Sequence, residues 1–331
     1  MRKIFDFKLP KDLIAQYPLK EREKAKLLVV HRDKMELIED IFYNIGKYFC
    51  KGDVLVLNDS RVIHARLRGV KSTGGRIEIF LLKKLGNKIW EVLLRGKIKI
   101  GQVIYIKHLI AKPLMKNESG SYIMEFTTDN DQDLFEIGEI PLPPYIKRKV
   151  IEEDTHFYQT VYAKKNGSIA APTAGLHFTE SLLKSLSEKG VSITFITLHI
   201  GWASFRMIKS ETVKVEEEFI ELSDETAQII NLARKKGNKI IAVGTSVVRT
   251  LESCFSQGKI QAKTGYTNLF IDPGFKFNVV DRLVTNFHLP QSTHLNIVCA
   301  LAGVCLIEKA YKLAIENKYR FYSYGDTMLI I

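Results

Sequence analysis

The alternation of apolar and polar residues has the period of β-strands in one long internal region of the chain. Between residues 66 and 150, short alternating stretches are separated by Gly, Asn and Lys. The clearest of these stretches are 76–82, 90–94, 103–106 and 122–126. Strands that follow one another without helices are typical of a small antiparallel barrel or sandwich. The region is therefore predicted to be an antiparallel β-barrel, closed by the stiff Pro-Leu-Pro-Pro-Tyr segment at 141–145.

Outside this region, helical and strand-like patterns alternate. The expected helices are 180–189, 224–236 and 293–309, and the expected strands are 27–30, 54–57, 191–198, 239–243 and 283–285. A polar, helix-like stretch also precedes the first strand. Alternating helices and strands favour a largely parallel sheet covered on both faces. We expect a layered α/β domain formed by residues 1–65 and 151–331, with an antiparallel β-barrel domain inserted at 66–150.

Composition adds a hint about the partner and excludes some classes of protein. The 331-residue chain has a formal net charge of +12, which favours a polyanion such as nucleic acid. Its lysines are dispersed, however, and a composition rich in Lys, Glu and Ile also arises from adaptation to heat. The longest apolar run, 297–307, is too short to span a bilayer, and no signal peptide is visible. Four scattered cysteines indicate reduced thiols, so we expect a cytoplasmic protein without a membrane anchor.

The segment from Ser168 to Thr179 is the most informative stretch of the chain. It is small, nearly free of charge, and contains Pro172, Gly175 and a lone His177. Small residues allow a ligand to approach the backbone, and a helix that follows would direct N–H groups back toward the loop. The alternative interpretation is a tight structural turn. The segment alone does not decide between them.

Polar residues follow four of the predicted strands. They are Asn58-Asp59-Ser60-Arg61, His199-Ile200-Gly201, Gly244-Thr245-Ser246 with Arg249 and Glu252, and Asn286-Phe287-His288. Ligands bind beyond the carboxyl ends of strands in open α/β sheets, so these residues are expected to share a site. The chain lacks a Walker A ending, a GxGxxG fingerprint and a GxSxG elbow. The wide spacing of its histidines argues against a zinc site.

Several long motifs in the same order resemble one known family. They are Ile14-Ala-Gln-Tyr-Pro18, Leu57-Asn-Asp-Ser-Arg-Val62, Gly138-Glu-Ile-Pro-Leu-Pro-Pro-Tyr-Ile146, Tyr158-Gln-Thr-Val-Tyr162, Ala170-Ala-Pro-Thr-Ala-Gly-Leu-His-Phe178, Gly244-Thr-Ser-Val-Val-Arg-Thr-Leu-Glu252, Thr285-Asn-Phe-His-Leu-Pro290 and Phe321-Tyr-Ser-Tyr-Gly-Asp326. With these motifs the chain resembles the S-adenosylmethionine:tRNA ribosyltransferase-isomerases of queuosine biosynthesis, nearly from end to end. The resemblance implies an α/β catalytic domain with an inserted β-barrel.

The resemblance also implies a reaction. Such an enzyme moves the ribosyl part of S-adenosylmethionine onto 7-aminomethyl-7-deazaguanine at the tRNA wobble position and isomerises it. The products are epoxyqueuosine, adenine and methionine. S-adenosylmethionine is consumed as a substrate, so we expect no separate cofactor and no metal. The expected partners are the precursor-bearing tRNA and S-adenosylmethionine, and the expected oligomeric state is a monomer.

The resemblance further implies which residues form the site. A base must remove a ribose proton next to the sulfonium, and an acid must assist the departure of adenine. The candidates for these catalytic roles are His177, His199, His288 and Asp59. The candidate substrate-binding residues are Asn58, Arg61, Thr173, Ala174, Gly175, Phe178, Gly201, Arg206, Gly244, Thr245, Arg249, Glu252, Asn286 and Asp326. Among them, Arg206 or Arg249 could hold the methionine carboxylate, and Phe178 or Phe287 could stack on adenine.

Each of these residues also has a structural alternative, because His177 could bond within its loop, Asp59 could cap a helix and Arg249 could form an ordinary ion pair. The sequence also departs from the family pattern at Val213 and Glu216, where histidines are usual, and at His294, where an apolar residue is usual. Two other functions stay open. One is a non-catalytic RNA-binding protein, and the other is an S-adenosylmethionine-dependent RNA methyltransferase, which would release S-adenosylhomocysteine.

Overall fold

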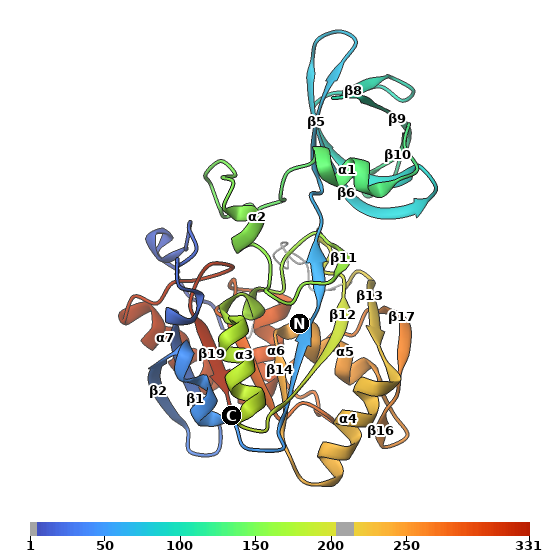
Figure 1. Cartoon of the computed structure of the whole chain (residues 1–331). Helices are drawn as coiled ribbons and strands as arrows, with labels where there is room; N and C mark the ends of the chain where they lie inside the picture. The colour runs from blue at the N-terminus through green and yellow to red at the C-terminus, as the bar shows by residue number, and fades with distance from the viewer. Residues whose placement is uncertain (1–4, 203–214) are drawn as a thin grey trace.

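The computed structural model describes residues 5–202 and 215–331 of the chain. A layered α/β body forms one part, and a β-barrel stands beyond one end of its sheet (Figure 1). The chain enters the barrel directly from the central sheet, because strand β3 (Val54–Asn58) is followed by the short β4 (Ser60–Val62) and then by the first barrel strand. The prediction of an α/β fold with an inserted antiparallel barrel is confirmed.

Nine strands make up the sheet of the body. Their order is β17 (Lys263–Thr267), β13 (Glu218–Leu222), β12 (Ser192–Leu198), β3, β14 (Ile240–Val243), β18 (Arg282–Asn286), β19 (Thr327–Ile330), β1 (Lys26–His31) and β2 (Glu36–Ile41). The four strands from β12 to β18 are parallel to one another. Antiparallel pairs lie on both sides of this group. The sheet is therefore mixed, with a parallel centre that brings the polar strand ends to one edge.

Both faces of the sheet are buried, as the apolar strands require. In β1, Leu28 and Val30 belong to one apolar cluster, whereas Leu27 and Val29 belong to the cluster on the opposite face. Four helices pack on the first face: α4 (Asp224–Lys235), α5 (Thr245–Ser253), α6 (Thr293–Ala302) and α7 (Val304–Glu316). The other face is covered by α3 (Glu180–Glu188) and the 3₁₀ helix η3 (Phe42–Tyr48).

Six antiparallel strands close the barrel. In barrel order they are β10 (Tyr122–Phe126), β7 (Ile89–Arg95), β6 (Arg76–Gly86), β5 (Arg66–Lys71), β8 (Ile104–Ile106) and β9 (Leu109–Lys116). Inward-facing residues such as Leu67, Ile79 and Val92 fill a core of its own. After the barrel, the chain forms α1 (Asp131–Ile137) and α2 (Asp154–Phe157) and then returns to the body through β11 (Lys165–Ser168), which pairs with β4.

Two local predictions are wrong. The helix expected at 293–309 is broken into α6 and α7 at Gly303, whose φ of 85° ends one helix and precedes the next. The polar stretch before β1 forms short 3₁₀ turns, η1 (Lys11–Leu13) and η2 (Arg22–Lys24), instead of an α-helix. Apolar periodicity did not reveal the break at Gly303, because helical spacing continues across it.

Candidate active site

A pocket lies where the carboxyl ends of the parallel strands meet the loop after β11. Its walls combine backbone turns, hydroxyl groups, aromatic rings and charged side chains from distant parts of the chain. They are Tyr145, Tyr158, Ala170, Ala171, Pro172, Thr173, Ala174, Leu198, Ile200, Glu218, Gly244, Thr245, Ser246, Arg249, Thr285, Asn286, Phe287, His288, Leu289, Ser292, His294, Tyr322 and Ser323. The ends of β12, β14 and β18 all contribute, as expected for an open α/β sheet.

Helix α5 begins at the pocket wall. Its N-cap is Gly244, which has a φ of 91° and no side chain to cap the first turn. Thr245 and Ser246, the first two helical residues, line the pocket. The helix after the loop at 168–179 was expected to direct free N–H groups toward that loop. In the structure this helix, α3, is instead capped by Thr179, whose hydroxyl accepts the N–H of Leu182. The helix terminus that can present N–H groups to a ligand is therefore that of α5.

The loop after β11 is fixed in place by contacts at its two ends. The Ser168 hydroxyl lies 2.6 Å from that of Ser60 and accepts the N–H of Ile200. Farther along, Gly175 packs so tightly that a Cβ atom would lie 2.0 Å from the Tyr162 hydroxyl oxygen. The loop is thus both a tight turn and a wall of the pocket, because Thr173 and Ala174 line it while Gly175 faces the protein interior.

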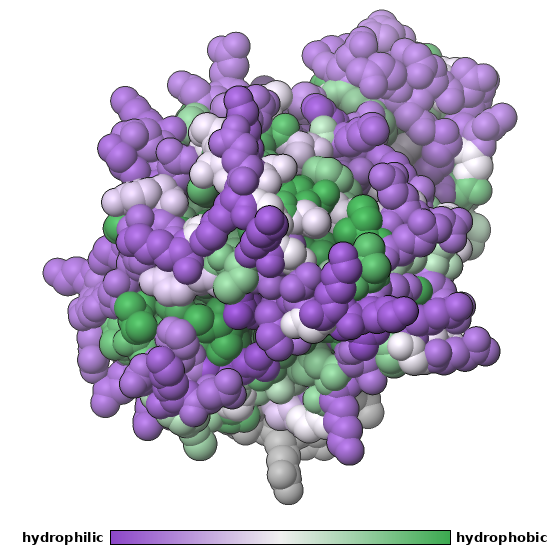
Figure 2. All heavy atoms as spheres, turned by 60° about the horizontal axis from the view of Figure 1, so that its bottom comes forward, coloured by the Kyte–Doolittle hydropathy of each residue, from purple (hydrophilic) through white to green (hydrophobic). Residues whose placement is uncertain are grey.

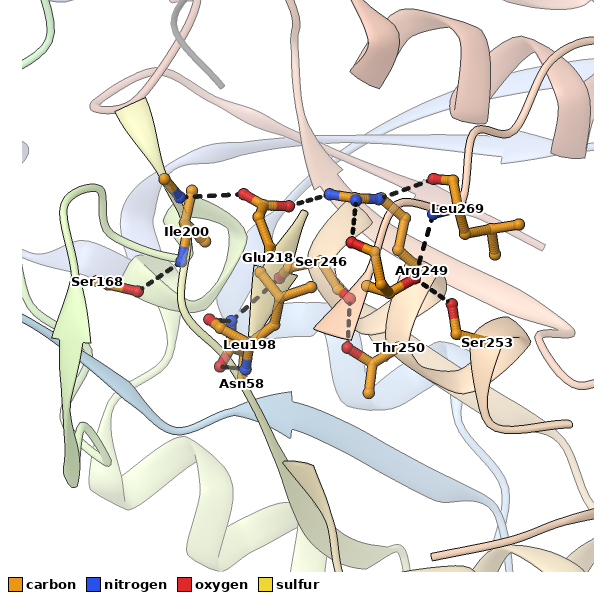
Figure 3. Close-up of polar contacts among 12 residues, drawn as sticks. Asn58, Ser168, Leu198, Ile200, Glu218, Ser246, Arg249, Thr250, Ser253 and Leu269 are labelled. Carbon is orange, nitrogen blue, oxygen red and sulfur yellow. Dashed lines mark hydrogen bonds and ion pairs between the residues drawn. The ribbon is translucent and has the colours of Figure 1, made fainter. Parts of the chain in front are cut away.

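An ion pair crosses one side of the pocket (Figure 3). Arg249, one turn into α5, contacts Glu218, the first residue of β13, and both side chains are nearly buried. The guanidinium also donates to the Leu269 carbonyl, and the second Glu218 oxygen accepts the N–H of Gly201 at 3.0 Å. A carboxylate and a guanidinium are therefore held side by side at the pocket wall. Such a pair can receive a ligand that carries both an ammonium and a carboxylate.

Two imidazoles lie together in the wall of the same pocket. His288 and His294 stack with ring centroids 5.3 Å apart, and Nε2 of His288 lies 2.7 Å from the Thr285 hydroxyl. Burial lowers the pKa of His288 well below its usual value, and the neighbouring His294 lowers it further. Burial also lowers the pKa of His294 to about 4, although Glu218 opposes the shift. Both rings are neutral near pH 7 and can accept a proton.

Some buried polar atoms at the pocket lack a well-formed hydrogen bond within the described residues. Oδ1 of Asn286 and the hydroxyl of Tyr158 form no hydrogen bond of standard geometry, although both residues line the pocket. The side chain of His177 lies near the Asn286 amide, and that of Ser323 lies near the Tyr158 hydroxyl. The amide nitrogen of Asn286 is bound to the Tyr322 carbonyl at 2.9 Å, which fixes the orientation of the amide. Buried polar groups are nearly always satisfied in folded proteins. An unsatisfied acceptor in a pocket wall therefore indicates where a ligand would donate.

The structure brings seven of the predicted site residues together in this pocket. They are Thr173, Ala174, Gly244, Thr245, Arg249, Asn286 and His288. Two more support its walls directly. Asn58 is fully buried, and its amide bonds Leu198 and Ser246 from below (Figure 3), whereas Gly201 bonds Glu218.

His177, His199 and Asp59 lie outside the pocket lining. His177 packs on Phe42, and burial lowers its pKa to about 4 despite the nearby Asn286 amide. His199 stacks on Phe219, and its Nδ1 lies 2.7 Å from the Ser60 hydroxyl. Asp59 accepts the Thr197 hydroxyl at 2.6 Å. Of the four predicted catalytic residues, His288 is the one in the pocket wall.

Five other predicted binding residues have structural contacts away from the pocket lining. Gly175 and Phe178 are buried, the latter within the core beneath the sheet. Exposed Arg61 donates to the Ala163 carbonyl. Glu252 accepts the backbone N–H groups of three consecutive residues, 278–280. Asp326 accepts those of Lys26 and Arg320, and burial raises its pKa.

Arg206 and Val213 lie outside the described residues, and Glu216 is exposed. Among the residues that the sequence did not suggest, Glu218 and Tyr158 stand out. Glu218 begins an antiparallel strand, and the start of such a strand lies at the same edge as the ends of its parallel neighbours. Strand direction was therefore the missing signal. The sequence marks His294 only as a departure from the family pattern.

Two kinds of feature are absent from the described parts of the chain. Within residues 5–202 and 215–331 there is no group of three or more His, Cys, Asp or Glu side chains placed to hold a metal ion. No helix in the same ranges is long and apolar enough to cross a membrane.

Known proteins resemble the chain over its full length. Residues 2–330 match the family model described as queuosine biosynthesis protein. Proteins named S-adenosylmethionine:tRNA ribosyltransferase-isomerase from Halothermothrix orenii and Carboxydothermus hydrogenoformans are 48% and 44% identical, and each alignment covers at least 98% of both chains. The crystal structure of S-adenosylmethionine tRNA ribosyltransferase from Thermotoga maritima is 38% identical, with a TM-score of 0.59 over 99% of this chain and all of that one. This chain therefore belongs to the family of queuosine biosynthesis proteins.

Proposed function

We propose that the chain transfers and isomerises the ribosyl group of S-adenosylmethionine onto 7-aminomethyl-7-deazaguanine at the wobble position of tRNA, which forms epoxyqueuosine and releases adenine and methionine. The names of its relatives, 44% to 48% identical over nearly their full lengths, support this activity. One structural observation carries the assignment to the pocket. The strand-end cavity contains an ion pair, neutral imidazoles and an unsatisfied amide oxygen in one wall.

The charged pair suits the methionine end of S-adenosylmethionine. We assign the carboxylate of the substrate to Arg249 and its ammonium to Glu218, since the two side chains already lie in contact at the wall. The adenine amino group would donate to Oδ1 of Asn286, whose orientation is fixed by the bond from its nitrogen to Tyr322. The rings of Tyr145 and Tyr322, 4.7 Å apart, offer π-faces to the sulfonium.

His288 is our candidate for the base that removes the ribose proton next to sulfur. Its ring lines the pocket and stays neutral near pH 7, because burial lowers its pKa. The sulfonium acidifies the adjoining carbon, so a weak base suffices when it is correctly placed. His294 and Thr285 would orient the ring.

The remaining properties belong to the same proposal. The protein would act as a cytoplasmic monomer, with precursor-bearing tRNA and S-adenosylmethionine as its two substrates and without a separate cofactor or metal. A chelator such as EDTA should leave the rate unchanged. A chelator-sensitive rate that zinc or magnesium restores would contradict the metal-free part of the proposal.

The decisive assay follows the small products. Purified protein is incubated with S-adenosylmethionine and tRNA that carries the precursor base, and with tRNA that carries unmodified guanine as the control. We expect equal amounts of adenine and methionine with the precursor tRNA alone. No release of adenine would contradict the enzyme activity and favour a non-catalytic RNA-binding protein. S-adenosylhomocysteine among the products would instead identify a methyltransferase.

A further inference from the structure

The positive charge of the chain is concentrated in the barrel. Residues 66–126 contain thirteen Lys and Arg but four Asp and Glu, so they carry +9 of the total net charge of +12. The rest of the chain is nearly balanced. The lysines are dispersed along the chain, but the excess of basic over acidic residues is largest in the barrel. The visible surface of the barrel lobe is mostly hydrophilic (upper right in Figure 2).

A groove on the barrel wall collects four arginines. Arg66 and Arg68 come from β5, Arg76 begins β6 and Arg95 ends β7. The four arginines lie on the outer face of the barrel because side chains alternate along a strand. The neighbouring residues Leu67 and Ile77 point into the barrel core. The pairing of Glu78 with Arg68 on one side and Arg95 on the other brings the three strands into register here.

Carboxylates neutralise only part of this cluster. Glu78 contacts Arg66 and lies 3.9 Å from Arg95, and Glu139 forms a two-pronged pair with Arg68. The side chain of Arg95 is 85% exposed, so replacing its contact with Glu78 by a contact with a phosphate costs little free energy. Four guanidinium groups thus line the groove, and two carboxylates, Glu78 within it and Glu139 beside Arg68, pair with them. Guanidinium forks match the geometry of phosphate oxygens, and an excess of them suits a chain of phosphates.

Aromatic contacts connect this groove to the pocket. The guanidinium carbon of Arg66 lies 5.6 Å from the centroid of the Phe80 ring, and Phe80 in turn lies 5.2 Å from Trp202. Trp202 follows Gly201, whose N–H is bound to Glu218 in the pocket wall. The arginine groove and the pocket therefore lie at the two ends of one continuous series of contacts between barrel and body.

We propose that this arginine groove, formed by Arg66, Arg68, Arg76 and Arg95, holds the phosphate backbone of the RNA substrate while the reacting nucleotide occupies the pocket. The inference rests on the proposed function for the identity of the polyanion. The wobble base lies in a single-stranded loop. When this base is turned outward into a pocket, the protein must bind the phosphate backbone on either side of it. RNA suits the groove better than an acidic protein would, because its charges are regularly spaced and every one is a phosphate.

Binding of an unmodified tRNA transcript to the full-length protein tests the groove independently of catalysis. Arg76→Glu with Arg95→Glu is compared with Lys112→Glu with Lys116→Glu, a control with the same change of charge on β9, which pairs with neither β5 nor β6. Fluorescence anisotropy at several salt concentrations gives the Kd and its salt dependence. We expect the groove variant to bind at least about tenfold more weakly near 0.1 M salt, with a log–log salt slope shallower by about 1.4 to 1.8, because two phosphate contacts are lost. The β9 variant should change the Kd by less than about threefold, because its charges act on the RNA only at long range, where salt screens them.

Equal weakening by both pairs would overturn the proposal in favour of a general charge effect, and unchanged binding by the groove variant would overturn it in favour of another partner for the groove. Thermal unfolding followed by circular dichroism checks the fold of each variant. If the reversed charges prevent folding, Arg76→Gln with Arg95→Gln replaces them and should still weaken binding. Failure of the proposed function is distinguishable, because a wild-type protein that binds tRNA through the groove but releases no adenine would refute the activity alone.

Discussion

Polar residues near the strand ends differ in whether their hydrogen bonds are complete. Glu252 and Asp326 each bind backbone N–H groups with both carboxylate oxygens, so they stabilise loops. Asn58 is similarly saturated by bonds to Leu198, Ser246 and Ser60. Asn286 differs because its Oδ1 forms no hydrogen bond of standard geometry within the described residues, although the His177 ring lies near the amide. Completeness of bonding, which no sequence motif displays, separates scaffold residues from candidates for ligand contact.

Asn286→Ala should weaken S-adenosylmethionine binding by about tenfold, because a hydrogen bond from the ligand to a buried acceptor is lost. Isothermal titration calorimetry measures the change in Kd. Asn296→Ala is the matched control, since Asn296 is also buried but bonds Asp272 outside the pocket lining. The control should lower the unfolding temperature and leave the Kd as it is. Equal Kd values for the two variants would remove Asn286 from the ligand site.

The buried His177 should make stability depend on pH. Burial lowers the pKa of His177 to about 4 from its usual 6.5, so between these values the unfolded chain binds a proton that the folded protein excludes. The free energy of unfolding therefore falls as the pH drops below about 6.5, and this one group contributes a loss of about 1 kcal/mol between pH 7 and 5.5. Urea unfolding of wild type and His177→Gln at both pH values measures it. The variant should lose less stability over this interval than wild type, whatever its stability at pH 7, and an equal loss would contradict the assignment.

Sequence reasoning found residues such as Gly244, Thr245, Asn286 and His288 because parallel strands deliver their carboxyl ends to one edge. It could not tell which way each side chain points. His199 follows β12 as expected, yet its ring turns toward Ser60 and packs over Gly167, where a Cβ would lie 2.5 Å away. Side-chain direction at a strand end depends on the local turn, and the pattern of apolar residues does not record that turn.

Among the elements, the uncapped helix N-terminus at the pocket is that of α5, whereas the sequence suggested the helix that follows the loop 168–178. The loop contributes small side chains and a rigid shape, whereas the open helix N-terminus belongs to α5. Thr179 explains the difference, because its hydroxyl satisfies the first turn of α3. Gly244 leaves the first turn of α5 without a side-chain cap.

The packing of the loop gives a prediction at this scale. Gly175→Ala should destabilise the protein by about 2 kcal/mol or more, because the added Cβ would meet the Tyr162 hydroxyl oxygen at 2.0 Å. Tyr162→Phe removes that oxygen, so the double variant should recover part of the loss, leaving the contact with Thr160 Cγ2 at 2.9 Å. Urea unfolding of the four proteins gives the coupling energy.

Gly86→Ala is the control, because no atom outside its immediate chain neighbours lies within 4 Å of the methyl group that the substitution adds. It should change stability far less than Gly175→Ala. Strictly additive effects of Gly175→Ala and Tyr162→Phe would show that the close contact does not determine the shape of the loop.

At the scale of the whole molecule, apolar periodicity predicted the two parts because a barrel and a layered sheet require different periods. It did not predict the mixed direction of the sheet. The last strand, β19, is buried between antiparallel β18 and parallel β1, and four apolar or small residues in a row do not encode direction. The arginine groove was also missed, since only the paired strands bring Arg66, Arg76 and Arg95 together.

We propose above that the strand-end pocket uses S-adenosylmethionine as a ribosyl donor to tRNA. Mass spectrometry of the nucleosides from precursor-bearing tRNA, digested after incubation with S-adenosylmethionine and the protein, tests it most directly. We predict that the precursor nucleoside is converted to the epoxyqueuosine nucleoside in proportion to the adenine released, and that His288→Gln loses at least about 100-fold in rate. An unchanged precursor nucleoside, or one heavier by a single methyl group, would contradict ribosyl transfer.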